Sequence, residues 1–391
     1  MKLALVTQDF PPAVGDIETY SLELAKRFAT SADSLIVLAP GGHKTRAIDS
    51  DLGFRIERCG TSSHALPATL APRLATLVAR GEVDVAFHSQ WQTLPASVAL
   101  RRSGRLRGLF AAAHGRELLL QPLGKLPFLQ SGYDVIRRGL LRSVDRLFPV
   151  STFAAHLLTQ AGVPTERCVV VANGTDPEHF RPMPAEALRL RLGLSRRPIL
   201  LFAGPLFPNK GVDTIIRALP QLAAHHPDVV FVIVGDGPDQ PRLRTLALEF
   251  AVEDRCQFVG RIPLADLPLF YSMADIFVTL SREEPPAVES FGIAFLEAGA
   301  CGTAVIGSRS GGIPDAVHEG VTGLLVPPND PDTFAQTAAG LLADHALRER
   351  MGKSGRARVV ASGHWDATHD KLLLSMHASL HPYAPVIHDL P

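Results

Sequence analysis

The stretch PILLFAGPLFPNKGVDTIIRAL, residues 198–219, decides the fold because it holds a complete strand, loop and helix. Its apolar run, residues 198–206, is continuous rather than alternating, which is typical of a strand covered on both faces. The strand ends near Gly204, and a helix opens near Gly211. Such a step predicts a parallel sheet with helices packed on it.

The same alternation of short apolar runs and helical segments continues through the chain. In the first half, the predicted strands are residues 2–7, 34–39, 83–89, 109–115, 145–151 and 168–174. In the second half, they are residues 198–206, 229–237, 256–262, 275–281, 303–308 and 323–328. Because repeated strand–helix steps imply right-handed crossovers, we predict an α/β protein with two Rossmann-like, doubly wound domains.

The length of 391 residues suits two domains of roughly 150–200 residues each. A segment rich in proline and arginine, residues 181–198, marks the joint. We predict an N-terminal domain at 1–182 and a C-terminal domain at 197–365, with a tail, 366–391, that packs back on the first. Since ligands bind at the carboxyl ends of such strands, we expect the site in a central cleft that both domains face.

The composition excludes several classes of protein. A formal net charge of zero argues against a nucleic-acid binder, and 46% apolar residues argue against disorder. The four cysteines form no CxxC pair, which disfavours a zinc site or a disulfide framework and favours a reducing, cytoplasmic compartment. The apolar N-terminus is too short for a signal peptide, and no run of roughly 18 apolar residues predicts a membrane span.

Charge is unevenly divided between the two halves. Residues 1–180 carry 20 Lys and Arg against 16 Asp and Glu, and the basic residues cluster in RRSGRLR (101–107) and IRRGLLRSVDR (136–146). These clusters are either solvated helix faces or a surface for an anionic partner, such as the inner leaflet of a membrane.

Lys210 lies at the mouth of the helix that opens near Gly211. A helix N-terminus with a nearby lysine can bind phosphate, although the lysine could equally be a solvated side chain. The chain has no GKS or GKT, and no GxGxxG follows a strand, so dinucleotide oxidoreductases and P-loop NTPases are disfavoured.

Two glutamates, Glu289 and Glu297, bracket an apolar segment in VESFGIAFLEAGACGTAVIG, residues 288–307. A helix should begin near residues 290–292 and end near residues 301–302, with backbone N–H groups of Phe291, Gly292 and Ile293 directed out of its start. An anionic group could bind there, with hydroxyls donating to a glutamate on either side. A nucleotide-sugar has this arrangement; the alternative is that Glu297 pairs with a buried arginine.

Several motifs together resemble the family 4 glycosyltransferases, over most of residues 1–345. In the first half they are VSTFAAHLLTQAGV (150–163) and VVVANGTDPEHFRP (169–182); in the second they include VIVGDGP (232–238), SMADIFVTLS (272–281), the block 288–317 and GVTGLLVPPND (320–330). The resemblance implies a GT-B fold and retaining transfer of a hexose, with no metal and no cofactor. The loop SREEPPAVESFGI (281–293) is similar to that of phosphatidylinositol mannosyltransferases.

The resemblance also assigns roles. It implies that Glu289 binds the hydroxyls of the donor sugar, that Glu297 holds the ribose and that Lys210 neutralises the leaving diphosphate. His114, in AAAHGREL, matches the family's histidine near the transferred sugar; as a lone residue it would more often be structural. The implied catalytic residues are His114, Lys210 and Glu289, and the implied donor-binding residues are Gly15, Asp16, Lys210, Arg261, Ile262, Glu289, Ser290, Phe291, Gly292, Ile293 and Glu297.

Two positions depart from the family pattern. Asp16 follows Gly15 where a second glycine is usual, and Pro205 stands where the family has an arginine, five residues before Lys210. An aspartate beside a diphosphate is repulsive, and losing an arginine removes a bidentate cation. Arg282 or Arg309 could compensate. The alternative is a catalytically weak GT-B binding subunit; an epimerase or phosphorylase is disfavoured because no lysine is placed for pyridoxal phosphate.

We therefore predict a retaining, metal-independent glycosyltransferase of cell-envelope biosynthesis. GDP-mannose is the first expected donor and a UDP-sugar the next, with a hydroxyl of a glycolipid, polysaccharide or small molecule as acceptor. We expect a cytoplasmic enzyme, peripheral at the inner membrane through its N-terminal domain where the acceptor is lipid-linked, and no nucleic-acid partner.

Overall fold

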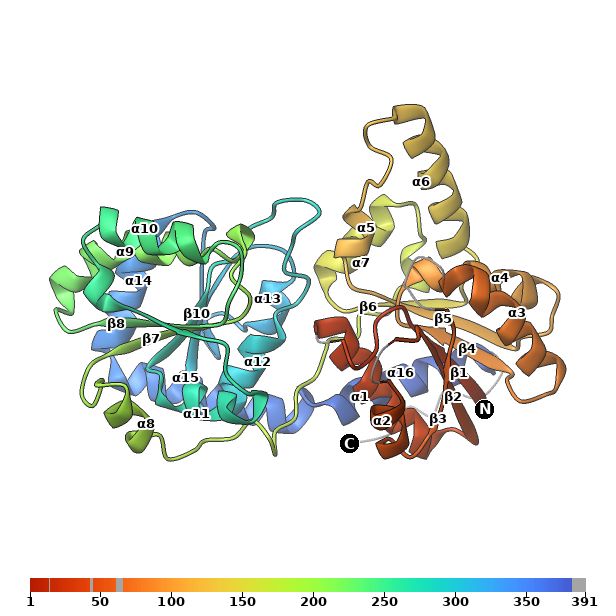
Figure 1. Ribbon diagram of the computed structural model, residues 1–391, viewed down its shortest axis with the longest axis horizontal. Helices are drawn as coiled ribbons and strands as arrows, with labels where there is room; N and C mark the ends of the chain where they lie inside the picture. Colours follow the sequence, from red (N-terminus) through yellow and green to blue (C-terminus); the bar gives the residue numbers. More distant parts are fainter. Residues whose placement is uncertain (14, 43–44, 61–65, 382–391) are drawn as a thin grey trace. The chain divides into compact units, whose positions relative to one another are not determined.

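The structure, a computed structural model, describes residues 1–13, 15–42, 45–60 and 66–381. It divides into two compact units (Figure 1): the first unit is residues 1–172 with the segment that begins at Trp365, and the second unit is residues 173–364. Each unit contains a six-stranded parallel sheet. The predicted α/β class with two Rossmann-like domains is confirmed.

The sheet of the first unit has the order β3-β2-β1-β4-β5-β6. Its strands β4 and β5 are buried along their whole length, which explains their continuous apolar sequences. The strands are β1 (Lys2–Val6), β2 (Ser34–Ala39), β3 (Arg55–Arg58), β4 (Val85–His88), β5 (Gly108–Ala113) and β6 (Arg146–Pro149).

Helices cover both faces of this sheet. On one face α3 and α4 form an apolar cluster that includes Leu141 of α6 and Leu158 of α7. On the other face α16 packs on α1, where Arg27 pairs with Asp366 at 2.6 Å. The helices are α1 (Asp16–Ser31), α2 (Thr45–Asp51), α3 (Leu66–Ala79), α4 (Pro95–Arg102), α5 (Arg116–Leu119), α6 (Pro127–Leu141), α7 (Thr152–Gln160) and α16 (Trp365–Leu380).

One predicted strand is wrong and one strand was missed. Residues 168–174 run beside β6, with the N–H groups of Val169 and Val171 bonded to carbonyls of β6, but they form only an isolated bridge. Pro149 has no main-chain N–H group to donate to the neighbouring segment, so the ladder of hydrogen bonds ends at this residue. The missed strand is β3, whose sequence Arg-Ile-Glu-Arg is too polar to stand out.

The sheet of the second unit has the order β12-β11-β10-β7-β8-β9, and all six of its predicted strands are observed. Its order reverses between β7 and β10, which are neighbours in the sheet. Such a switch point is where doubly wound sheets bind ligands. The strands are β7 (Ile199–Ala203), β8 (Val230–Val234), β9 (Cys256–Gly260), β10 (Ile276–Thr279), β11 (Ala304–Ser308) and β12 (Gly323–Val326).

Two layers of helices enclose this second sheet (Figure 1). One layer contains α9, α10 and α14, and the other contains α8, α11, α12 and α15. The helices are α8 (Glu186–Arg191), α9 (Val212–His225), α10 (Gln240–Glu249), α11 (Leu267–Met273), α12 (Ile293–Ala300), α13 (Ile313–Ala316), α14 (Pro331–Ala343) and α15 (His345–Ser362).

Residues 173–198, which contain the proline- and arginine-rich segment, belong to the second unit. Arg189 of α8 donates to Asp275 at 2.9 Å and to the Met273 carbonyl at 2.8 Å. Arg356 of α15 donates to the carbonyl of Phe180 at 2.9 Å. These bonds attach the segment to α11 and α15. Across the described part of the chain, every helix is too short or too polar to cross a bilayer.

Candidate active site

The switch point of the second sheet brings Lys210 and Glu289 together. Lys210 follows β7 and Glu289 follows β10, so both lie beyond the carboxyl ends of adjacent strands. Nζ of Lys210 lies 2.6 Å from Oε2 of Glu289, whose side chain is only 10% exposed. The carboxylate therefore has the cationic partner that its burial requires.

A left-handed glycine fixes the loop that carries Lys210. Gly211 has φ of +70° and lies directly before α9, as predicted. A Cβ atom there would lie 2.0 Å from the carbonyl oxygen of Leu280. Only glycine permits this approach, so the loop after β7 is held against the end of β10.

The start of α12 adjoins Glu289. Gly292 has φ of +93° and caps the helix, which runs from Ile293 to Ala300 close to the predicted bounds. Among the described residues, the main-chain N–H groups of Ser290, Phe291 and Gly292 have no acceptor. A helix start with such N–H groups beside a lysine favours an anion.

A glycine-rich loop after β11, not assigned to the site from the sequence, supports Glu289 from the other side. The N–H of Gly312 donates to the Glu289 carbonyl at 2.9 Å. Gly311 has φ of +54°, and a Cβ atom there would lie 2.3 Å from the same carbonyl oxygen. The adjacent glycines Gly311 and Gly312 in SRSGG are the sequence feature that could have indicated a close main-chain contact at the site.

Glu297 lies on α12 and is half-buried, whereas Glu289 is buried. The hydroxyl of Tyr271 in α11 donates to Oε2 of Glu297 at 2.7 Å. Tyr271 is buried and packs edge-on against Phe277, so it holds the carboxylate from a fixed position. Sequence spacing alone did not indicate Tyr271.

Arg261 and Ile262 follow β9 at the same edge of the sheet. Arg261 is 82% exposed, and its Nε lies 3.8 Å from Asp236, which follows β8. Ile262 is half-buried. A loosely held arginine and an apolar side chain could contact a flat base, but Arg261 is not fixed by the protein.

The two arginines considered as replacements for Pro205 already have acidic partners. Arg282 donates to Asp213 at 2.9 Å and to Glu284 at 2.6 Å. Arg309 pairs with Glu319 at 2.7 Å. Pro205 itself is exposed in the loop after β7. Of these cations, only Lys210 therefore contacts Glu289.

His114 belongs to the first unit, directly after β5. It is 5% exposed, and its Nε2 lies 3.0 Å from the main-chain carbonyl of Ser89. Because a carbonyl only accepts, Nε2 carries the proton. Burial lowers the pKa of His114 to about 4, so the ring is neutral near pH 7 and Nδ1 is a hydrogen-bond acceptor.

Two buried polar residues near His114, Glu117 and Gln90, were not among the predicted site residues. Glu117 accepts the N–H of His114 at 2.7 Å, and burial raises its pKa. Gln90 donates to Asp9, which follows β1. Within the described chain, Oε2 of Glu117 and Oε1 of Gln90 have no partner. The signal for Glu117 was its place three residues after His114.

Gly15 and Asp16 also lie in the first unit, where α1 begins. Gly15 has an extended backbone, and Asp16 is exposed in the first helical turn. Burial raises the pKa of nearby Glu18, and the charges of Asp9 and Asp16 add to the effect. The acidic side chains in the first turn of α1 are stabilised by the helix N-terminus, but their charge opposes the binding of a diphosphate there.

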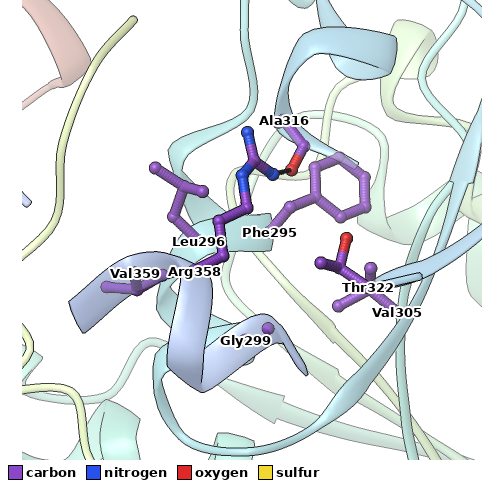
Figure 2. Close-up of a pocket in the computed structure, with 9 residues that line it drawn as sticks. Phe295, Leu296, Gly299, Val305, Ala316, Thr322, Arg358 and Val359 are labelled. Carbon is purple, nitrogen blue, oxygen red and sulfur yellow. Dashed lines mark hydrogen bonds between the residues drawn. The ribbon is translucent and has the colours of Figure 1, made fainter. Parts of the chain in front are cut away.

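A crevice on α12 contains none of the predicted site residues (Figure 2). Phe295, Leu296 and Gly299 of α12 line it, with Arg358 of α15, which donates to the carbonyl of Ala316. These contacts are packing between helices. In the ranges that the structure describes, no group of three or more His, Cys, Asp or Glu side chains could hold a metal ion.

Comparison with known proteins identifies both units. The family described as Glycosyl transferases group 1 matches residues 186–358, and the family described as Glycosyl transferase 4-like domain matches residues 15–174. Several curated relatives span nearly the whole chain. A GDP-mannose-dependent alpha-(1-6)-phosphatidylinositol monomannoside mannosyltransferase of Mycolicibacterium smegmatis is 31% identical, over 93% of this chain and 95% of its own.

The second relative is the GDP-mannose-dependent monoacylated alpha-(1-6)-phosphatidylinositol monomannoside mannosyltransferase of Corynebacterium glutamicum. It is 30% identical over 95% of this chain and 96% of its own. Among solved structures, Anabaena Alr3699/HepE in complex with UDP matches with a TM-score of 0.81 and 21% identity, over 97% of this chain and 100% of its own. That likeness supports the GT-B fold.

Proposed function

The chain belongs to the group 1 glycosyltransferases, and on that premise we propose that it transfers mannose from GDP-mannose to a hydroxyl of a phosphatidylinositol-linked acceptor. The observation that carries the transfer chemistry is the pairing of Lys210 with buried Glu289 beside the start of α12. A cation and a carboxylate side by side suit the two halves of a nucleotide-sugar.

On the donor side, Lys210 neutralises the charge that develops on the leaving diphosphate. The N–H groups of Ser290 to Ile293 add donors at a helix N-terminus, where negative charge is stabilised. Glu289 accepts hydrogen bonds from hydroxyls of the transferred sugar. Pro205 supplies no charge, and Arg282 is paired with Asp213. Lys210 therefore provides a larger share of the positive charge that stabilises the diphosphate than it would beside an arginine.

Two further contacts bind the nucleoside. Glu297, held by the hydroxyl of Tyr271, accepts from the ribose hydroxyls. The main chain around Arg261 and Ile262 contacts the base. A carboxylate fixed on a helix recognises two vicinal hydroxyls because it offers two acceptor oxygens.

His114 acts on the transferred sugar as a neutral acceptor. Its Nε2 proton is donated to Ser89, so Nδ1 can accept from a sugar hydroxyl. The acceptor hydroxyl attacks the anomeric carbon on the face that the diphosphate leaves, and the departing phosphate oxygen takes its proton. This path retains the anomeric configuration and needs no protein nucleophile.

The choice of donor and acceptor rests on the relatives. The two relatives described above are named for GDP-mannose and phosphatidylinositol monomannoside, at 30–31% identity. A lipid-linked acceptor also places the enzyme at a membrane surface, through the first unit, which carries the basic clusters.

The test is calorimetric titration with GDP and UDP, followed by transfer of labelled mannose from GDP-mannose to phosphatidylinositol monomannoside in detergent. We expect micromolar GDP binding and a dimannoside product that an α-mannosidase cleaves. Preference for UDP, with transfer from a UDP-sugar, would replace the donor in this proposal. Nucleotide binding without transfer to any lipid acceptor would replace the acceptor.

A further inference from the structure

The first unit exposes an apolar surface at α6 and the loop before it. Phe128 is 89% exposed, Val135 68% and Ile136 64%, and Leu126 is more than half exposed. Figure 1 shows the start of α6 standing away from the sheet of its unit. Isolated exposed apolar residues are ordinary, but a cluster on one element indicates a partner.

The outward face of α6 is the apolar one. At 100° per residue, Phe128, Gly132, Val135, Ile136 and Gly139 share one side, and all five are exposed. The opposite side contains residues that pack on the unit's core, Tyr133, Leu140 and Leu141. The helix therefore has a second apolar face beyond the one that attaches it.

Exposed cations flank this face, whereas acidic groups do not. Arg116, Lys125, Arg138 and Arg142 are exposed. Between residues 116 and 142 the acidic side chains are Glu117, which is buried, and Asp134, which is half-buried and pairs with Arg137 at 2.8 Å. The surface thus combines insertable side chains with uncompensated positive charge.

This combination favours an anionic bilayer over a second copy of the chain. Two copies that met through α6 would bring like charges together, which opposes association. A bilayer offers hydrocarbon for Phe128, Val135 and Ile136 and headgroup phosphates for the arginines. Long basic side chains can also reach the headgroups from the flank of an inserted helix.

We propose that the α6 face, defined as Leu126, Phe128, Leu129, Val135 and Ile136 with the flanking Lys125, Arg138 and Arg142, inserts into anionic membranes. The inference rests on the proposed function, because a lipid-linked acceptor explains why the enzyme would bind a membrane. Its test measures vesicle binding and does not depend on the acceptor. It assigns membrane contact to one element instead of to the basic clusters in general. Membrane binding through the α6 face does not require the basic cluster RRSGRLR at residues 101–107.

Vesicle flotation tests the proposal directly. The whole protein should bind vesicles of equimolar phosphatidylcholine and phosphatidylglycerol, and bind phosphatidylcholine alone more weakly. Changing Phe128 and Ile136 to Ser should reduce binding to anionic vesicles at least about tenfold for each residue. Changing Lys125, Arg138 and Arg142 to Gln should reduce it about fivefold for each charge.

Matched controls separate insertion from general effects. Leu374 of α16 is 73% exposed in the same unit, so Leu374→Ser removes an exposed apolar side chain away from α6 and should leave binding unchanged. GDP titration of every variant reports the donor site independently. If the wild-type protein did not bind GDP, the proposed function would be wrong, but the proposed membrane contact would not be affected.

A tryptophan probe locates the contact. Both native tryptophans, Trp91 and Trp365, are buried, so Phe128→Trp adds an exposed reporter. Its emission should shift to the blue with anionic vesicles and be quenched by brominated lipid tails. Unshifted emission with vesicles bound would overturn the proposal. So would a dimer in sedimentation that the serine variants of Phe128 and Ile136 convert to monomer.

Discussion

Nζ of Lys210 and Oε2 of Glu289 lie 2.6 Å apart, although 79 residues separate them in the sequence. Their proximity follows from topology, because the strands that precede them, β7 and β10, are neighbours at the point where the sheet order reverses. The fold thus places a cation and a carboxylate at one position before any ligand binds. Preorganised charges of this kind cost little reorganisation during reaction.

The two partners should have separable effects on catalysis. Lys210→Ala removes the cation that faces the diphosphate, and we expect GDP to bind roughly ten- to a hundred-fold more weakly. Glu289→Gln keeps the shape of the side chain but removes its charge. It should leave GDP affinity within about threefold and reduce kcat with GDP-mannose about a hundredfold. Titration calorimetry and initial rates measure both quantities.

A control addresses the buried charge that Lys210→Ala leaves behind. The double variant Lys210→Met with Glu289→Gln contains neither charge, so its melting temperature should exceed that of Lys210→Ala. If Glu289→Gln weakened GDP binding as much as Lys210→Ala, the separate roles would be wrong.

Tyr271 should tune nucleotide affinity through Glu297. Tyr271→Phe keeps the ring against Phe277 and Phe180 but removes the hydroxyl that donates to Oε2 of Glu297. We expect GDP affinity to fall by roughly three- to tenfold. Affinity for 2′,3′-dideoxy-GDP, which lacks the hydroxyls that Glu297 would bind, should be equal in wild type and variant. An equal loss for both nucleotides would instead indicate a general packing defect.

Acid should destabilise the protein through His114. Its pKa is lowered from 6.5 to about 4 by burial, so the unfolded chain binds a proton more readily than the folded one between these values. The unfolding free energy is therefore unaffected above pH 6.5 and falls as the pH drops toward 4. At pH 5 the loss from His114 is about 2 kcal/mol.

His114→Gln isolates this effect. A glutamine amide can still donate to the carbonyl of Ser89 but does not titrate. The drop in melting temperature between pH 7 and pH 5 should be smaller in the variant than in the wild type. His88, whose pKa burial lowers to about 3, contributes in the same direction in both proteins. An identical drop in both would mean that His114 is not buried as a neutral ring.

Much of the fold could be predicted because buried parallel strands have continuous apolar sequences. All six strands of the second sheet and five of the six strands of the first sheet were visible in this way. Strand β3 could not be predicted, since an edge strand with the sequence Arg-Ile-Glu-Arg needs no apolar run. Segment 168–174 was apolar enough, but Pro149 interrupts the ladder it would join.

The site was predictable in part for a similar reason. Lys210 and Glu289 were recognised as site residues from their motifs, and the structure brings those two together. Tyr271 and Gly311 were not recognised, because each acts on a site residue through a contact that only the folded chain creates. Glu297 was recognised as a carboxylate at the end of an apolar segment, and its side chain is half-buried.

Substitution of Gly311 distinguishes the effect of backbone strain from the effect of a steric clash with Glu289. The φ of +54° at Gly311 disfavours any other residue, and a Cβ atom would lie 2.3 Å from the Glu289 carbonyl oxygen. Gly311→Ala must therefore move the main chain of Glu289, and a displacement of about 1 Å can reduce kcat about a hundredfold. Gly320 is the matched control, with φ of +75° and open space around its Cβ position.

Gly320→Ala should carry only the strain of a left-handed alanine, about 1 kcal/mol, and should retain wild-type kcat. Melting temperatures and initial rates of the two variants, measured side by side, make the comparison. We expect Gly311→Ala to lose more stability and almost all of the activity. If both variants lost the same stability and kept the same rate, the contact between Gly311 and Glu289 would have no part in holding the carboxylate beside Lys210.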